Sequence, residues 1–308
     1  MKKDKFIKAY LNATPLPIDN IHEARRLERQ RSSIAARIPF SGTIDNITAD
    51  TGHNELSQVR VYTPQGPGPF PVILYMHGGG FSLGSPDTAD NLCRTLATAS
   101  EAVLVSVDYK LSPEYKFPSA LEECYRLALW IDAQDVALNV RNDQLVIAGD
   151  SAGGNLAAAL CLLARKRKEF VPAYQVLICP LLDQRTPLTD KLGRMRDSLI
   201  NIENMQTFSG YYLNNPDEAE NPLASPLLAE SLINLPPATI VTAELDPLHS
   251  EALTYATRLR KSGIPVSHHY YPGQVHDFIL FIKALEEARG AAEAVAKDLV
   301  AFFTPEEK

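Results

Sequence analysis

Short apolar runs separated by amphipathic segments dominate the middle of the chain. Five runs are nearly continuous in apolar residues, as strands buried on both faces are: 71–77, 102–109, 144–150, 174–181 and 238–246. Segments with helical spacing of apolar residues lie between or after them, at 88–100, 118–132, 152–168, 249–262 and about 283–303. This alternation predicts an α/β fold with a mostly parallel central sheet flanked by helices on both faces.

Two further segments suit the edges of this sheet. Residues 56–64 (LSQVRVYTP) alternate between apolar and polar side chains, which predicts an early antiparallel edge strand. Residues 266–273 (VSHHYYPG) are more polar than the central runs and suit an edge as well.

Two stretches do not fit the alternation and predict a helical cap. The segment up to about residue 45 contains an amphipathic pattern at 21–36, and 184–225 is far longer than an ordinary connection between strands. We expect both to pack over the carboxyl edge of the sheet and to line a pocket there. The predicted domains are an N-terminal cap segment, a first core part, a cap insertion and a second core part, at 1–45, 46–183, 184–225 and 226–308.

The charge of the chain disfavours two classes of partner. The chain has 308 residues and a net charge of −7, which argues against nucleic-acid and anionic-membrane binding. The basic runs at 164–168 and 23–31 suit a helix C-terminus and a solvated helix face. The first 17 residues lack an apolar run of signal-peptide length, and no later stretch is apolar enough to span a bilayer. We therefore expect a cytoplasmic protein.

The four cysteines, Cys93, Cys124, Cys161 and Cys179, are scattered and form no C-x-x-C motif. Three of them lie in apolar runs, so buried thiols are expected in place of disulfides or a metal site.

A serine between glycines is the first candidate for chemistry. Ser151 lies in the sequence G-D-S-A-G, after an apolar run and before an alanine-rich helix. Glycine permits close backbone approach at such a strand-to-helix turn and leaves the serine hydroxyl at its apex. Alone, this motif also fits a tight turn with an incidental serine.

Two later residues complete the pattern. A serine hydroxyl needs a base, and only His276 of the seven histidines lies in a loop between the last strand and the final helix. Asp246 follows the preceding strand, whereas its rival Glu244 still lies within that strand. The order Ser151, Asp246, His276 is the order of a nucleophile, acid and base on a doubly wound sheet whose strand ends carry the site.

A glycine run supplies candidate electrophilic groups. His77 is followed by Gly78, Gly79 and Gly80, directly after a strand, so that backbone N–H groups are exposed without side-chain obstruction. A phosphate-binding loop is disfavoured because no G-x-G-x-x-G or G-K-[ST] motif is present. The N–H of Ala152, at the start of a helix, offers a further donor to an oxyanion.

These blocks resemble the hormone-sensitive-lipase-like carboxylesterases, and among them the bacterial acetyl esterases. The resemblance is carried by HGGGF, VDYKLSPEYKFPSALEE, GDSAGGNLA, DPL and YPGQVHDF, spread from about residue 70 to 280. It implies an α/β-hydrolase fold with a helical cap, no cofactor, a small-molecule ester substrate and often a homodimer.

The resemblance also assigns roles to residues. It implies Ser151, Asp246 and His276 as a catalytic triad, and the N–H groups of Gly78, Gly79 and Ala152 as an oxyanion hole. We interpret Glu114, in the SPE of the second block, as scaffold.

The prediction is a serine carboxylesterase that hydrolyses short-chain acyl esters through an acyl-enzyme. A serine peptidase or amidase on the same fold is the alternative, followed by a non-catalytic small-molecule receptor. One position departs from the family, which usually has glycine or alanine after the histidine where this chain has Asp277. A carboxylate there raises the pKa of the base if it faces the imidazole. We expect it instead to turn away and cap the helix beginning near Phe278.

Overall fold

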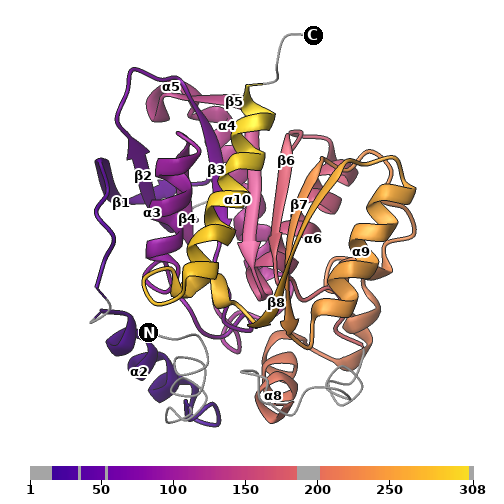
Figure 1. Cartoon of the computed structure of the whole chain (residues 1–308). Helices are drawn as coiled ribbons and strands as arrows, with labels where there is room; N and C mark the ends of the chain where they lie inside the picture. Colours follow the sequence, from indigo (N-terminus) through magenta and orange to yellow (C-terminus); the bar gives the residue numbers. More distant parts are fainter. Residues whose placement is uncertain (1–15, 34–35, 53–54, 186–201, 305–308) are drawn as a thin grey trace.

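The computed structural model describes residues 16–33, 36–52, 55–185 and 202–304. One eight-stranded sheet runs through the molecule in the order β1-β2-β4-β3-β5-β6-β7-β8 (Figure 1). The strands are β1 (Gly42–Asp50), β2 (Leu56–Pro64), β3 (Phe70–Met76), β4 (Val103–Asp108), β5 (Val140–Asp150), β6 (Tyr174–Ile178), β7 (Ala238–Leu245) and β8 (Val266–Val275). Pairing is parallel from β4 to β8 and antiparallel at β1–β2 and β2–β4, so the predicted mostly parallel sheet is confirmed.

Helices cover both faces of the sheet. They are α2 (Ile21–Ser33), α3 (Asp90–Ala99), α4 (Ser119–Ala133), α5 (Asp135–Leu138), α6 (Ala152–Arg167), α8 (Ile202–Tyr212), α9 (His249–Lys261) and α10 (Glu286–Phe303), with 3-10 turns η1 (Pro216–Glu220), η2 (Pro226–Leu228) and η3 (Phe278–Phe281). The five helices predicted between or after the buried strands are confirmed as α3, α4, α6, α9 and α10.

Strand β3 shows how the sheet separates two apolar cores. Its side chains are all buried, and successive residues point to opposite faces. Leu74 and Met76 belong to the core that includes α4, α6 and α9, whereas Ile73 and Tyr75 belong to the core that includes α3 and α10. Burial on both faces is the reason that β3 is apolar along its whole length.

The antiparallel edge differs from the sequence prediction. The strand expected at this edge, 56–64, is β2, but it lies second in the sheet and pairs with β1 along Gly42–Asp50. Most of β1 is exposed, so it carries no apolar run that the pattern could detect. The segment 266–273, which suits an edge, is confirmed as part of β8, the last strand at the other edge of the sheet.

Helices α2 and α8, which come from the two stretches outside the alternation, lie at the same end of the sheet (Figure 1). Ile21 of α2 and Leu83 of the loop after β3 are buried in a small apolar cluster with Phe208 and Tyr211 of α8 packed against it. Part of the predicted cap insertion, 186–201, lies outside the described residues, as does 1–15 of the N-terminal segment.

All four cysteines are buried as free thiols, as the apolar runs around three of them predict. Within the described residues, no helix is both long and apolar enough to cross a membrane.

Candidate active site

Ser151 lies at the turn between β5 and α6 in a backbone conformation that residues other than glycine rarely adopt. Its φ and ψ are 52° and −116°. The turn is fixed by the Ser151 N–H, which donates to Ile178 O at 2.8 Å. A Cβ at Gly153 would collide with the carbonyl oxygen of Met76, and a Cβ at Gly149 with that of Gly153. The flanking glycines are therefore required by close backbone packing, and the serine is held in a strained conformation.

His276 and Asp246 meet this serine from two other strand ends. His276 follows β8, and its Nε2 lies 2.8 Å from Ser151 Oγ. Asp246 follows β7, and its Oδ2 lies 3.0 Å from His276 Nδ1, within ion-pair distance. Asp246 is 1% exposed and His276 is 8% exposed. The structure thus brings together the three side chains that the sequence singled out.

Charge around the imidazole favours its protonated form. Burial lowers the pKa of His276, but the carboxylates of Asp246 and Asp277 outweigh burial and hold this pKa well above its ordinary value. Asp246 is itself oriented by Leu248, whose N–H donates to Oδ1 at 2.8 Å.

The rival candidates are engaged elsewhere. His269 Nε2 lies 2.7 Å from Asp298 Oδ2, between β8 and α10. A carboxylate oxygen of Glu244 accepts the N–H of Gly273 at 2.5 Å. These contacts leave His276 as the histidine that faces Ser151.

The glycine loop requires one correction. The N–H of Gly78 donates to Asp150 Oδ2 at 3.0 Å, so this donor, predicted to face an oxyanion, is engaged inside the protein. Within the described part of the chain, the N–H groups of Gly79, Gly80 and Ala152 donate to no acceptor. Gly79 and Gly80 have φ values of 112° and 59°, which a glycine adopts readily.

Asp150 is a contributor that the sequence analysis did not single out. It immediately precedes Ser151, is 1% exposed, and accepts the Tyr75 hydroxyl at 2.5 Å through Oδ1 and the Gly78 N–H through Oδ2. Burial, reinforced by Asp277, raises the pKa of Asp150 to about 8. The carboxyl joins the glycine loop, the central strand β3 and the nucleophile turn. Its place in the motif, between glycine and serine, is the one signal that could have indicated it.

The prediction that Asp277 caps a helix is wrong. Its side chain makes no capping hydrogen bond to η3. Instead its Oδ2 lies 3.1 Å from His276 Nε2. The backbone of Asp277 has a φ of 52°, and this left-handed conformation accompanies a side chain that faces the imidazole.

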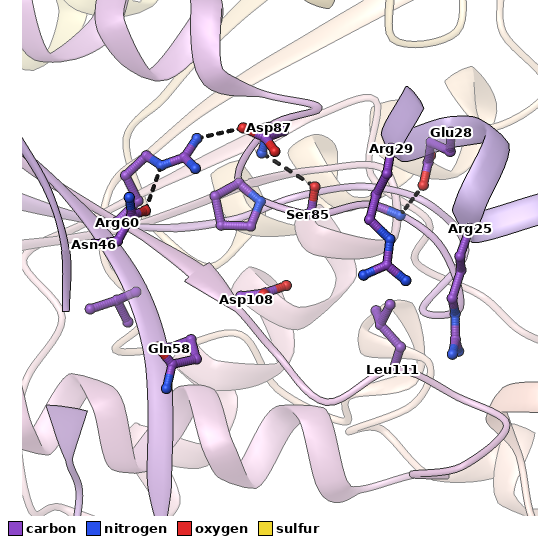
Figure 2. Close-up of a pocket in the computed structure, with 13 residues that line it drawn as sticks. Arg25, Glu28, Arg29, Asn46, Gln58, Arg60, Ser85, Asp87, Asp108 and Leu111 are labelled. Carbon is purple, nitrogen blue, oxygen red and sulfur yellow. Dashed lines mark hydrogen bonds and ion pairs between the residues drawn. The ribbon is translucent and has the colours of Figure 1, made fainter. Parts of the chain in front are cut away.

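The N-terminal helix is tied to the loops beside the site. The Arg25 guanidinium donates to the carbonyl oxygens of Ser82 and Ser112 at 2.8 and 2.7 Å and pairs with both carboxylate oxygens of Glu114, each at 2.8 Å. Glu28 accepts the N–H of Gly84 at 2.7 Å, as Figure 2 shows. The contacts of Glu114 fit the scaffold role expected from the sequence.

A cavity of about 320 Å³ lies between α2 and the antiparallel edge of the sheet (Figure 2). Arg29, Arg60 and Asp108 are among the residues that line it, and neither Ser151 nor His276 is. It is therefore separate from the site around the serine.

One group of side chains is close enough to share a cation. Among the described residues, Cys179, His276 and Asp277 offer ligand atoms within 4.8 Å of one another. Burial, with the charges of Asp246 and Asp277, raises the pKa of Cys179 well above its ordinary value, so the sulfur is held as a thiol. A thiol is a poor metal ligand, and the imidazole faces the serine, so the set favours proton transfer over metal binding.

Comparison with known proteins places this arrangement in a family. Residues 73–280 match a family with the alpha/beta hydrolase fold. An ethyl acetate hydrolase of Pseudomonas putida is 33% identical over 273 residues, which cover 86% of this chain and 85% of the relative. An arylesterase of Saccharolobus solfataricus is 36% identical over 244 residues, covering 78% and 79%. The solved structure of a hyperthermophilic esterase from Pyrobaculum calidifontis has a TM-score of 0.90 at 36% identity and covers 97% of both chains.

The chain belongs to the hormone-sensitive-lipase-like carboxylesterases of the α/β-hydrolase superfamily, as its motifs predict. It is a carboxylic-ester hydrolase.

Proposed function

We propose that the protein is a serine carboxylesterase that works through an acyl-enzyme. The observation that carries the proposal is the 2.8 Å contact between Ser151 Oγ and His276 Nε2, with Asp246 on the other side of the imidazole. In this mechanism His276 accepts the serine proton as Oγ attacks the ester carbonyl, and then gives it to the departing alcohol. Water attacks the acyl-enzyme by the same route. Asp246 stabilises the imidazolium in both steps.

The oxyanion of each tetrahedral intermediate is stabilised by backbone donors. We assign the N–H groups of Gly79 and Ala152, as the sequence analysis did, and Gly80 in place of Gly78. These three N–H groups have no acceptor among the residues that the structure describes, which supports the assignment. Loss of one such donor typically slows a reaction about 10²–10³-fold.

The substrate class is a small ester with a short acyl chain, from about acetyl to hexanoyl. The Phe208 ring of α8 lies directly against Gly80, so that a Cβ there would collide with it. An aromatic wall beside a proposed oxyanion donor restricts the space for a long acyl chain. The relative from Pseudomonas putida, named for hydrolysis of ethyl acetate, fits the same class.

The test is a series of p-nitrophenyl esters from acetate to palmitate, with the matched anilide of acetate as the amide control. We expect the highest kcat/KM at or below hexanoate, little amide cleavage, and loss of both activities in Ser151→Ala. A Ser151→Ala protein that is folded and turns over esters normally would exclude the mechanism. Faster cleavage of the anilide than of the ester would favour the peptidase or amidase alternative, and binding without turnover would favour a receptor.

The cytoplasmic location and the homodimer stay predictions. Cell fractionation tests the first, and size-exclusion chromatography with light scattering tests the second.

A further inference from the structure

Two groups compete for one nitrogen of the proposed base. His276 Nε2 lies 2.8 Å from Ser151 Oγ and 3.1 Å from Asp277 Oδ2. Its other nitrogen, Nδ1, faces Asp246 Oδ2 at 3.0 Å. The imidazole is therefore held between two carboxyl groups, one on each nitrogen.

The contact between His276 and Asp277 requires a proton. An ionised carboxylate and an unprotonated Nε2 are both acceptors and repel each other at this distance. Either the imidazolium N–H donates to Asp277, or a protonated Asp277 donates to Nε2. In both states Nε2 is engaged, and it accepts the proton of Ser151 only after the shared proton has left for solvent.

The surroundings decide how firmly this proton is held. Facing the pair are Asp246 after β7, Asp150 at the end of β5, Cys179 after β6 and the hydroxyl of Tyr75 on β3, with Cys93 of α3 behind Tyr75. The negative charge of Asp246 favours retention of the proton. Oδ1 of Asp277 is buried and accepts no hydrogen bond from the described residues. The negative charge of an ionised Asp277 is therefore not stabilised by a neutral donor at this oxygen.

Continuing from the proposed esterase mechanism, we infer that Asp277 is a positioning residue that holds a proton on the pair formed with His276 and displaces the working range of the enzyme to higher pH. The family pattern of glycine or alanine at this position lacks the second carboxyl group. Asp277 thus sets the pH at which the general base becomes available, without contacting the substrate.

The pKa values of the surrounding groups agree with this geometry. Burial lowers the pKa of His276, whereas the carboxylates of Asp246 and Asp277 raise it. The effect of the carboxylates is the larger, so this pKa lies well above its ordinary value. Burial raises the pKa of Asp277, although the charge of His276 opposes that change. Because His276 Nε2 and Asp277 Oδ2 are 3.1 Å apart, the protonation of one group affects that of the other, and the acidic limb of the rate profile reports on both.

The test compares Asp277→Asn and Asp277→Gly with the wild type. Asparagine and glycine both tolerate the left-handed backbone at this position, so the fold is expected to persist. We expect the acidic limb of kcat/KM to move to lower pH by about 1–3 units in both variants. At a fixed pH below the pKa values of both proteins, kcat/KM of the variant exceeds that of the wild type by about tenfold for each unit of the shift.

Asp298→Asn is the matched control, because it removes a carboxylate that contacts a different histidine, His269, at 2.7 Å. We expect its limb to coincide with that of the wild type. If the Asp277 variants are folded by circular dichroism and their limb also coincides with the wild type, the inference is wrong. An equal shift in Asp298→Asn would overturn it too, since the cause would then be net charge.

An NMR titration separates this inference from the esterase proposal. The Cε1–H signal of His276, assigned by its loss in His276→Gln, reports protonation without substrate. We expect it to titrate above about 6.5 in the wild type and lower in Asp277→Asn. A wild-type value at or below about 6.5 overturns the inference whatever the activity. A protein with no esterase activity but with the expected shift overturns only the proposed function.

Discussion

The N–H of Gly78 donates to Oδ2 of Asp150, and this bond joins the glycine loop to the residue before the proposed nucleophile. The same carboxyl accepts the hydroxyl of Tyr75. One buried side chain therefore fixes the distance between the proposed oxyanion donors and the serine that they serve. Its loss affects catalysis through position, because both carboxyl oxygens of Asp150 accept hydrogen bonds from the protein, from Tyr75 and Gly78.

Asp150→Ala leaves two buried donors, those of Tyr75 and Gly78, without an acceptor. An unsatisfied buried donor costs about 1–3 kcal/mol. We expect Asp150→Ala to lose at least this much unfolding free energy and to lose activity, measured by urea denaturation and ester hydrolysis. Asp150→Asn, which keeps an acceptor for Gly78, should retain more of both. Equal stability of the alanine and asparagine variants would contradict this account.

The ionisation of Asp150 predicts a pH dependence of stability. Its folded pKa of about 8 lies above the ordinary value of 3.8. The neutral form is thus favoured by folding, and its contribution is complete below about pH 4 and is lost as the pH rises through about 8. We expect the unfolding free energy of the wild type to fall more steeply from pH 5 to pH 9 than that of Asp150→Asn. Parallel curves for the two proteins would show that the carboxyl is ionised throughout.

The backbone at Ser151 predicts opposite effects on activity and stability. A non-glycine residue in such a conformation costs about 1–3 kcal/mol, whereas glycine loses about 0.5–1 kcal/mol of additional entropy on folding. We expect Ser151→Gly to be more stable than Ser151→Ala by about 1 kcal/mol, with both inactive on esters. Urea denaturation of the two variants measures the difference. A less stable glycine variant would mean that the turn is not strained.

Arg25 and its neighbour Arg26 form a matched pair on α2. Arg25 bridges to Ser82, Ser112 and Glu114, whereas the Arg26 guanidinium pairs with Glu23 on the exposed face. We expect Arg25→Ala to destabilise α2 by about 1–3 kcal/mol, visible as faster amide hydrogen exchange in α2, and to lower kcat/KM. Arg26→Ala should change stability by less than about 1 kcal/mol, as exposed ion pairs do. The same exchange rates in both variants would exclude an anchoring role for Arg25.

The central sheet could be predicted because burial leaves a direct trace in the sequence. Strands such as Phe70–Met76 are buried on both faces and must be apolar throughout. Strand β1 (Gly42–Asp50) could not be found this way, since it lies at an edge and is held by backbone hydrogen bonds that any side chains permit. Chain order and strand ends likewise sufficed to single out Ser151, Asp246 and His276.

The details of the site depend on side-chain directions that the sequence does not encode locally. Asp277 has a φ of 52° and faces His276 without capping η3, and neither its backbone conformation nor this contact can be read from the neighbouring sequence. Whether Gly78 offers its N–H to a ligand depends on Asp150, which is 72 residues away in the chain and reaches it only in the folded sheet. For this reason the prediction of a helix cap at Asp277 was wrong, and the prediction of the oxyanion donors was incomplete at Gly78.

The contact between Phe208 and Gly80 predicts how acyl specificity can be changed. Each additional methylene that is buried offers about 0.8 kcal/mol of binding, so a short-chain preference requires a wall that excludes longer chains. If Phe208 is this wall, Phe208→Ala raises the ratio of octanoate to acetate kcat/KM. Tyr211→Ala is the control, because it removes another ring of the same helix and the same apolar cluster. The hydroxyl of Tyr211 donates to Ile18 O, in the N-terminal segment. A rise confined to Phe208→Ala identifies the wall, whereas an equal rise in both variants would mean that the cap has loosened as a whole and that Phe208 sets no limit.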